Sequence, residues 1–377
     1  MINQARLVKL ARQLIRIDSQ NPPGNERQIA RFIVDYLRSI GLRAQNRAFS
    51  KGRENVLAVV PGRSRRRSLL ISPHLDTVPA GRGWKTNPFA GQTRAGRIYG
   101  LGATDCKGNL AAAIEALNSL TEEKARLDYS LLFAATADEE SGSGRGLIPL
   151  LRKGLLQAEA ALILDADNFE IIVTKKGLLH LKFSLEGKRS HGAYPGRGVN
   201  AIDLAIDALA EIKSLRLPFQ KNKYLRPPTL NTGTIRGGDK VNIVADWCEV
   251  ELDYRFLPGM RAQDFLKALS KILRRHTAKF KVEVEGIQRP YEISAQHPLV
   301  SGLQKSCRKY GVRPRVKGSE GATVITFFQE KKIPAVAFGF GSAGCAHSVN
   351  EYAQINNLVQ GARVLEEFLR NENDRSS

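Results

Sequence analysis

His74 and Asp76 stand two residues apart, directly after a short apolar run at residues 69–71. In a metal site, an acid beside a histidine fixes the orientation of the imidazole and raises its basicity. A buried histidine that is bonded to a nearby acid for purely structural reasons gives the same pattern. The pair alone therefore leaves both interpretations open.

Three consecutive acids follow a second apolar run, at residues 131–135. Asp138, Glu139 and Glu140 repel one another unless protons or cations intervene, and a dication would resolve this conflict. An exposed acidic loop is the alternative interpretation.

Three further groups complete the set of candidate ligands. Asp165 ends the apolar run at 160–164, and His347 follows a glycine-rich segment after the run at 333–338. Asp105 lies in a glycine-flanked turn before a predicted helix, where it could also serve as the helix N-cap.

If the apolar runs are parallel strands, their carboxyl ends meet at one edge of a sheet, where α/β proteins bind ligands. The candidate side chains are then expected to converge. Two imidazoles and three carboxylates suit a pair of zinc ions, and a shared carboxylate would hold the ions roughly 3.5 to 4 Å apart.

The elements that position these groups follow from periodicity. Helical spacing of Leu and Ile predicts helices at 7–17, 29–40, 111–120 and 358–369. Short apolar runs predict strands at 55–60, 69–71, 131–135, 160–164 and 333–338. Alternation of strands with helices predicts an α/β layer architecture.

The pattern changes at about residue 177. Apolar and polar residues alternate at 179–185, 248–254 and 280–284, and helical periods occur at 201–214 and 262–275. This pattern indicates a half-buried antiparallel sheet with helices. Because helix, strand and helix return after residue 291, we expect an α+β domain at 177–290, inserted between the two parts of the catalytic domain at 1–176 and 291–377.

Composition limits the class of protein. The chain has 377 residues, and no apolar run approaches the roughly 18 residues that a membrane span needs. The first residues are amphipathic, so we predict no signal peptide. The cysteines lie far apart, at Cys106, Cys248, Cys307 and Cys345. Reduced thiols in the cytoplasm are the expectation.

The formal net charge of +21 could indicate nucleic acid, an acidic membrane or anionic substrates. The basic residues are spread along the chain, with one short cluster at Arg63, Arg65, Arg66 and Arg67. Aromatic residues make up 7% of the chain and do not interleave with the charge. A solvated basic surface is therefore favoured over a nucleic-acid site.

Five motifs now occur in a fixed order: SPHLDTVP, YGLGATDCKG, ADEE, GKRSHGAYPGRGVNAI with GTIRGGDKVNIV, and AHSVNE. This set resembles the co-catalytic zinc amidohydrolases that include acetylornithine deacetylase, succinyl-diaminopimelate desuccinylase and glutamate carboxypeptidase. The resemblance covers nearly the whole chain. It implies a zinc-peptidase-like catalytic domain, in which helices cover both faces of a mixed sheet (α/β/α), with an inserted α+β, ferredoxin-like dimerisation domain.

By this resemblance, one zinc ion, or a cobalt ion in its place, would be held by His74 and Asp165. Glu140 and His347 would hold the other ion, and Asp105 would bridge the two. Asp76 would orient His74. Glu139 would be the general base, which takes a proton from the attacking water and hands it to the leaving amine.

The resemblance also assigns residues of the inserted domain. His191 would reach the active site of the partner subunit of a homodimer and donate to the oxyanion. Arg255, helped by Asn242, would bind the substrate carboxylate. From the residues alone, Arg255 could instead pair with Glu249, Glu251 or Asp253 along the same face of its strand. The bond from Asp105 to Cys106 is predicted to be cis.

Some positions depart from the family pattern. Asp165 stands where most relatives have glutamate, and Cys106 and Asn109 replace a frequent methionine and glycine. A cysteine ligand at Cys106 or Cys345 stays open. The segment at 318–323, which touches substrate in the family, also differs, so the substrate is in question.

The favoured function is hydrolysis of the amide bond of an N-acyl amino acid, with acetylornithine or succinyl-diaminopimelate as specific candidates. A metallo-carboxypeptidase or dipeptidase would use the same metals and the same Arg255. A non-catalytic basic binding protein is the third alternative, and the complete ligand set argues against it.

Overall fold

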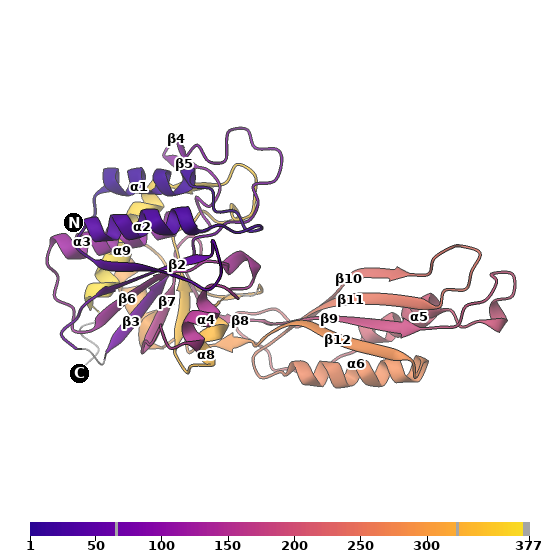
Figure 1. The fold of residues 1–377 in the computed structure, drawn as a ribbon. Helices are drawn as coiled ribbons and strands as arrows, with labels where there is room; N and C mark the ends of the chain where they lie inside the picture. The colour runs from indigo at the N-terminus through magenta and orange to yellow at the C-terminus, as the bar shows by residue number, and fades with distance from the viewer. Residues whose placement is uncertain (65–66, 322–323, 372–377) are drawn as a thin grey trace. The chain divides into compact units, whose positions relative to one another are not determined.

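The computed structural model of the chain describes residues 1–64, 67–321 and 324–371 (Figure 1). Arg65 and Arg66 of the basic cluster, and Ala322 and Thr323 of the departing segment, lie outside the described residues. Among the described residues, none of the helices combines the length and the apolar character that a membrane span requires.

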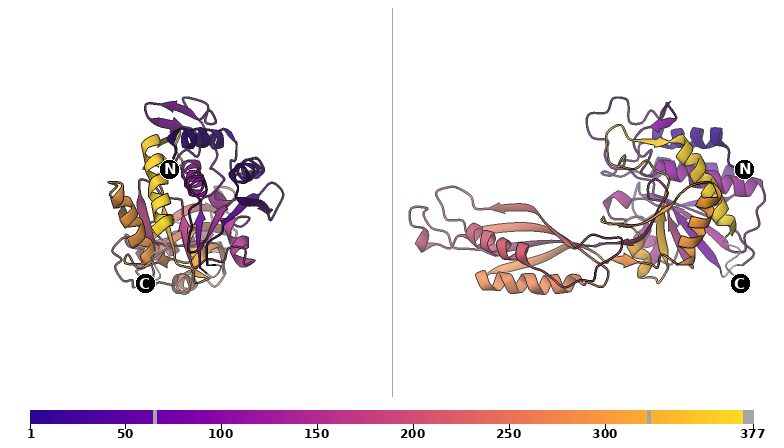
Figure 2. Two further views of the ribbon diagram at one scale, coloured as in Figure 1. Left: turned by 90° about the vertical axis from the view of Figure 1, so that its left-hand side faces the viewer. Right: turned by 180° about the vertical axis from the view of Figure 1, so that it is seen from behind.

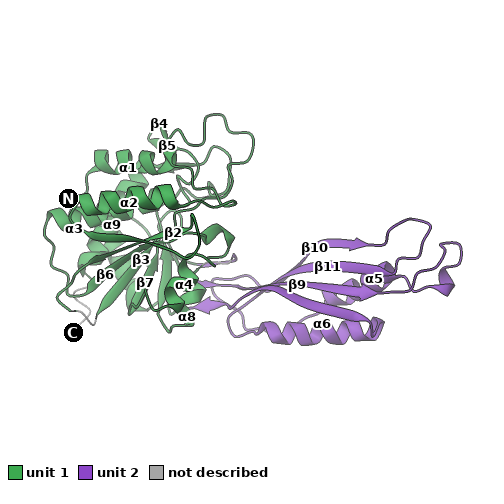
Figure 3. Ribbon diagram, viewed as in Figure 1, with its two compact units in different colours: residues 1–173, 293–317, 324–377 green, residues 174–292, 318–323 purple. Residues whose placement is uncertain are grey.

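The chain forms two compact units (Figure 3). Unit 1 comprises Met1–Val173, Ile293–Lys317 and Val324–Ser377, and unit 2 comprises Thr174–Glu292 and Gly318–Thr323. The part of unit 2 that is continuous in sequence thus begins and ends within three residues of 177–290. The short segment from Gly318 also joins this unit.

The main mixed sheet has the order β1-β2-β6-β3-β7-β15-β8-β13, and β14 pairs with β8. All of its strands belong to unit 1 except β13 and the last residues of β8 and β14. Its strands are β1 (Arg43–Ala48), β2 (Glu54–Val60), β3 (Ser68–Ser72), β6 (Ser130–Ala135), β7 (Ala160–Ile163), β8 (Glu170–Lys175), β13 (Tyr291–Glu292), β14 (Arg315–Ser319) and β15 (Ala335–Phe338). The four central strands β6, β3, β7 and β15 run parallel. The predicted α/β class is confirmed.

Helices lie on both faces of this sheet (Figures 1 and 2). They are α1 (Gln4–Arg16), α2 (Arg27–Ser39), α3 (Lys107–Glu122), α4 (Leu147–Arg152), α7 (Pro298–Lys309), α8 (Ile325–Gln329) and α9 (Ile355–Asn371). The chain steps from β3 to one neighbour, β6, through α3, and from β6 across to the other neighbour, β7, through α4. Right-handed crossovers in opposite directions place α3 and α4 on opposite faces.

The Ala-rich helix α3 is buried on all sides from Lys107 to Leu120. It packs against α1 and α9, and a helix that is buried all round carries no polar face. A small sheet of β4 (Gln92–Arg94), β5 (Arg97–Tyr99) and β16 (Tyr352–Gln354) completes unit 1.

Unit 2 has the order β-α-β-β-α-β of a ferredoxin-like fold. Its elements are β9 (Gly177–Glu186), α5 (Ala201–Ser214), β10 (Thr229–Gly237), β11 (Trp247–Phe256), α6 (Ala262–His276) and β12 (Phe280–Gln288). The strands form an antiparallel sheet in the order β10-β11-β9-β12. Inward-facing residues of β9 and β11 form one core with the apolar faces of α5 and α6, as their alternation predicts.

Some boundaries and elements were wrong or missing in the sequence prediction. The last parallel strand begins at Ala335 rather than at residue 333, because Pro334 has no N–H for the ladder. Strands β1 and β10 were not predicted, since most of their residues are polar and exposed or half-buried. The 3₁₀ turns at Glu139–Ser141 and Pro195–Arg197 were also not predicted.

Candidate active site

Four neighbouring parallel strands deliver the predicted ligands to one edge of the sheet. His74 follows β3, Glu140 follows β6, Asp165 follows β7 and His347 follows β15. The pairing of β3 with β6 continues beyond the strands as a bridge between His74 and Thr136. The carboxyl ends of parallel strands therefore bring these four side chains together, as expected from their order.

Asp105 lies between the two histidines. Its Oδ1 is 2.9 Å from Nε2 of His74, and its Oδ2 is 3.1 Å from Nε2 of His347. Nε2 of His347 is also 3.2 Å from Oε2 of Glu140, and Nε2 of His74 is 3.7 Å from Oδ1 of Asp165. The Asp105 carboxylate thus faces His74 and Asp165 with one oxygen, and His347 and Glu140 with the other.

These donors suit a pair of metal ions. His74, Asp105 and Glu140 can offer ligand atoms within 4.8 Å of one another, and so can His74, Glu139 and Asp165. Oε1 of Glu140 is buried and has no hydrogen-bond partner among the described residues. Imidazole nitrogen with carboxylate oxygen is a donor set that zinc accepts, so the residues fit the implied metals.

Burial and crowding change the acidity of the site. Burial, together with repulsion from Asp165, raises the pKa of Glu139 well above its usual value. Burial also raises the pKa of Asp165 to about 6. Hydrogen bonds to Asp105 and Glu140 raise the pKa of His347 to about 10. Below these pKa values, Asp165 and His347 hold protons that a binding dication must displace.

Asp76 is fully buried and organises the neighbouring acids. Its Oδ1 accepts the backbone N–H of Glu139 at 3.0 Å, and its Oδ2 accepts that of Glu140 at 3.1 Å. Asn21 donates to Oδ2 at 2.9 Å. Nδ1 of His74 lies 3.0 Å from the backbone oxygen of Asp76 and 3.6 Å from its carboxylate. Asp76 therefore contacts His74 through its backbone, and its carboxylate holds the ADEE turn.

The loop that carries Asp105 explains two of the departures from the family pattern. The Asp105–Cys106 bond is cis, as predicted. Cys106 is buried, burial raises its pKa to about 12, and its sulfur accepts the backbone N–H of His74 at 3.1 Å. Asn109 accepts the N–H of Phe340 and donates to the oxygen of Ala166. Asn109 thus ties together the loops after β7 and β15.

Two buried side chains that sequence reasoning missed support the acidic turn. Arg53 binds Glu26 through two hydrogen bonds and Asp138 through a third. Asp138 has a φ of +64°, in the left-handed region that non-glycine residues rarely adopt. No sequence signal links these three segments. Their contacts hold the residue that precedes Glu139 in a strained conformation.

The remaining predicted residues lie in unit 2. The exposed His191 accepts the N–H of Ala193 at Nδ1, so a neutral His191 carries its hydrogen on Nε2. The backbone oxygen of Asn242 accepts the backbone N–H of Gly192, which places Asn242 beside the His191 loop. Arg255 makes two hydrogen bonds to Asp253, at 2.7 and 2.9 Å. Arg255 therefore pairs with an acid of its own strand, which is the alternative that the sequence left open.

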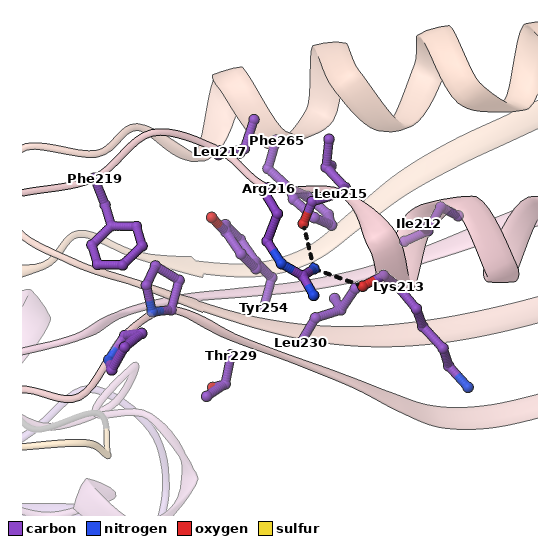
Figure 4. A pocket seen from close by; sticks show the side chains of 12 residues that line it. Ile212, Lys213, Leu215, Arg216, Leu217, Phe219, Thr229, Leu230, Tyr254 and Phe265 are labelled. Carbon is purple, nitrogen blue, oxygen red and sulfur yellow. Dashed lines mark hydrogen bonds between the residues drawn. The ribbon is translucent and has the colours of Figure 1, made fainter.

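Unit 2 also contains a cavity of about 460 Å³ at the end of α5 (Figure 4). The rings of Tyr254 and Phe265 stack at 4.1 Å on its wall, and Arg216 is anchored there on the backbone oxygens of Lys213 and Leu215. The predicted site residues are not among those that line it.

Comparison with known proteins agrees with this architecture. The chain is 30% identical to an acetylornithine deacetylase of Edwardsiella ictaluri, over 92% of this chain and 90% of that protein. The structure of a Staphylococcus aureus tripeptidase matches with a TM-score of 0.85 and 26% identity, over all of both chains. A metallo-carboxypeptidase of Sulfolobus solfataricus shares the fold, with a TM-score of 0.80, 21% identity, and coverage of 97% of this chain and 98% of that one.

The profile of peptidase family M20/M25/M40 matches residues 70–371. This range contains every predicted metal ligand. The chain therefore belongs to peptidase family M20/M25/M40 and is a metallohydrolase of that family.

Proposed function

We propose that this chain is a di-zinc hydrolase that cleaves the amide bond of an N-acyl amino acid, of the acetylornithine deacetylase or succinyl-diaminopimelate desuccinylase type. The observation that carries the proposal is the position of Asp105, with one oxygen toward His74 and the other toward His347. The name of the curated relatives at about 30% identity supports the choice of substrate class.

In this proposal, His74 and Asp165 hold one ion, Glu140 and His347 hold the other, and Asp105 is shared. Cobalt could replace zinc because the donors are nitrogen and oxygen. Bound ions of this kind would polarise an amide carbonyl. They would also lower the pKa of water, so that it loses a proton more readily and becomes a better nucleophile.

Glu139 is the proposed general base. Its pKa is raised by burial, and a carboxylate whose pKa moves toward neutrality can both accept and return a proton at the working pH. The bond from its backbone N–H to Asp76 fixes the start of its side chain. Glu139 would accept a proton from the attacking water and deliver it to the amine that leaves.

We further propose that the working enzyme is a homodimer formed through unit 2. The apolar side chains of Ile206 on α5 and Ile235 on β10 are 54% and 48% exposed. Strand β10 ends the sheet order of unit 2, and an edge strand offers N–H and C=O groups with which a second chain can pair. His191, with its hydrogen on Nε2, would donate to the oxyanion in the partner's site.

Arg255 is the proposed anchor for the substrate carboxylate. Asp253 occupies Nε and one terminal nitrogen of its guanidinium. The other N–H groups of the planar fork remain for a carboxylate, and Asn242 would assist. Both groups suit an N-acyl amino acid and also the C-terminus of a peptide.

Peptide hydrolysis is the second candidate, favoured by the 26% identity to a tripeptidase over the full length of both chains. The two functions are separated by assaying one zinc-loaded preparation in parallel on acetylornithine, succinyl-diaminopimelate, dipeptides and tripeptides. We expect turnover of an N-acyl amino acid. Turnover of peptides alone would reject the deacylase, and no turnover of any amide by protein that holds two ions would reject the hydrolase.

A further inference from the structure

Glu351 lies four residues after His347 and is only 2% exposed. Its carboxylate accepts three backbone N–H groups from the turn that carries Asp105. Oε1 accepts those of Thr104 at 2.7 Å and Asp105 at 3.0 Å, and Oε2 accepts that of Gly102 at 2.8 Å. One buried side chain therefore satisfies three donors of this turn.

The contact continues along the backbone. The backbone oxygen of Glu351 accepts the N–H of Gly100. The hydroxyl of Thr104 donates to the backbone oxygen of Tyr352 at 2.7 Å. Strand β16, which starts at Tyr352, pairs with β5 just before the turn. The segment after His347 is thus bound to the segment before Asp105 through both side chain and backbone.

The shape of the turn explains why a carboxylate is needed. Gly102 has a φ of +80°, and a Cβ atom there would lie 2.7 Å from the Cγ2 of Thr77. The amides of Gly102, Thr104 and Asp105 point toward one place, as amides do in a nest that binds an anion. Buried N–H groups without an acceptor are costly, and two carboxylate oxygens serve all three.

We propose that Glu351 is a positioning residue for the metal centre: it holds Asp105 so that its two oxygens stay directed at both metal positions. The role rests on the two-metal function proposed above. Asp105 is the group shared between the His74 side and the His347 side. Release of its turn would therefore weaken the binding of both ions.

The test is a metal titration of the Glu351→Gln variant of the full chain, with Zn²⁺ and with Co²⁺. The amide oxygen of glutamine can keep two of the three bonds, but its NH₂ group then faces a third N–H. Loss of a group that orients a ligand typically reduces metal affinity 10- to 100-fold. We expect a loss of about this size for both ions, and a changed Co²⁺ absorption spectrum, because the ligand geometry changes.

Glu366→Gln is the matched control. Glu366 is a buried carboxylate on α9 that binds Ser119 and Arg370, away from the Asp105 turn. Its variant should bind both ions like the wild type. Equal weakening in both variants would show a general loss of structure and would overturn the proposal.

Wild-type affinity and spectrum in Glu351→Gln would also overturn it. Glu351→Asp keeps the charge but shortens the side chain by one methylene, and it decides the question if the glutamine variant does not fold. We expect weaker binding of both ions, whereas wild-type binding in that variant would reject the role. Fewer than two ions on the wild-type chain would instead contradict the proposed function.

Discussion

Replacement of Asp76 by asparagine tests how the acidic turn is held. The carboxylate accepts the N–H groups of Glu139 and Glu140 and the side-chain amide of Asn21. An asparagine NH₂ group at the Oδ2 position would face two donors, whereas at Oδ1 it would face one. The variant is therefore expected to keep the bonds on the Oδ2 side and to lose the bond to Glu139.

The expected cost follows from that loss. A hydrogen bond to a charged group contributes about 1.5 to 3 kcal/mol, and a buried donor left without an acceptor costs about 1 to 3 kcal/mol. Because the two costs overlap, we expect the free energy of unfolding of the metal-free Asp76→Asn protein to fall by about 2 to 5 kcal/mol. Turnover should fall further than metal affinity, since the backbone of the proposed base is released.

Denaturant unfolding monitored by circular dichroism measures the first quantity, and a chelator-competition titration measures the second. Asp35→Asn, on the exposed surface of α2, is the control and should change stability by less than about 0.5 kcal/mol. A change of that small size in Asp76→Asn would refute the assignment of its carboxylate to the turn.

Three other predictions concern the metals, the base and the dimer. Glu139→Ala should abolish turnover and leave zinc bound, as measured by metal analysis beside an activity assay; retained turnover would mean that the base is another group. His347 is protonated below its raised pKa of about 10, and Asp165 below about 6. Because bound zinc displaces these protons, zinc affinity should rise about tenfold per pH unit between pH 6 and 9. Calorimetry in two buffers should detect the protons that zinc binding releases. An affinity independent of pH would contradict the raised pKa values. Ile206→Glu with Ile235→Glu should convert the proposed dimer into a monomer in light scattering, and an unchanged mass would place the interface elsewhere.

The parallel strands of unit 1 were predictable because each is a short apolar run. Each run is followed by a histidine or a carboxylate that can bind a metal ion. His74 and Asp165 could be placed at one sheet edge from that pattern alone. The supporting contacts were not predictable. Asp76 and Glu351 act on backbone N–H groups of segments remote in sequence, and a sequence pattern does not show where such donors point.

Polar edge strands were missed for a related reason. Strand β10 has polar residues at most positions, and its strand conformation depends on pairing with β11 rather than on its own apolar alternation. Arg255 shows the reverse case. Its place on β11 followed from alternation, but its pairing with Asp253 rather than with another acid of the strand appears only in the structure.

Metal content measured together with turnover tests the central claim most directly. The chain should hold two zinc ions, lose hydrolysis of N-acyl amino acids when both are removed by a chelator, and recover it as the ions are restored. The Asp105→Asn variant should bind both ions more weakly, because its side chain no longer offers a carboxylate oxygen to each. Full hydrolysis by metal-free protein, or unchanged binding of two ions by Asp105→Asn, would contradict the account.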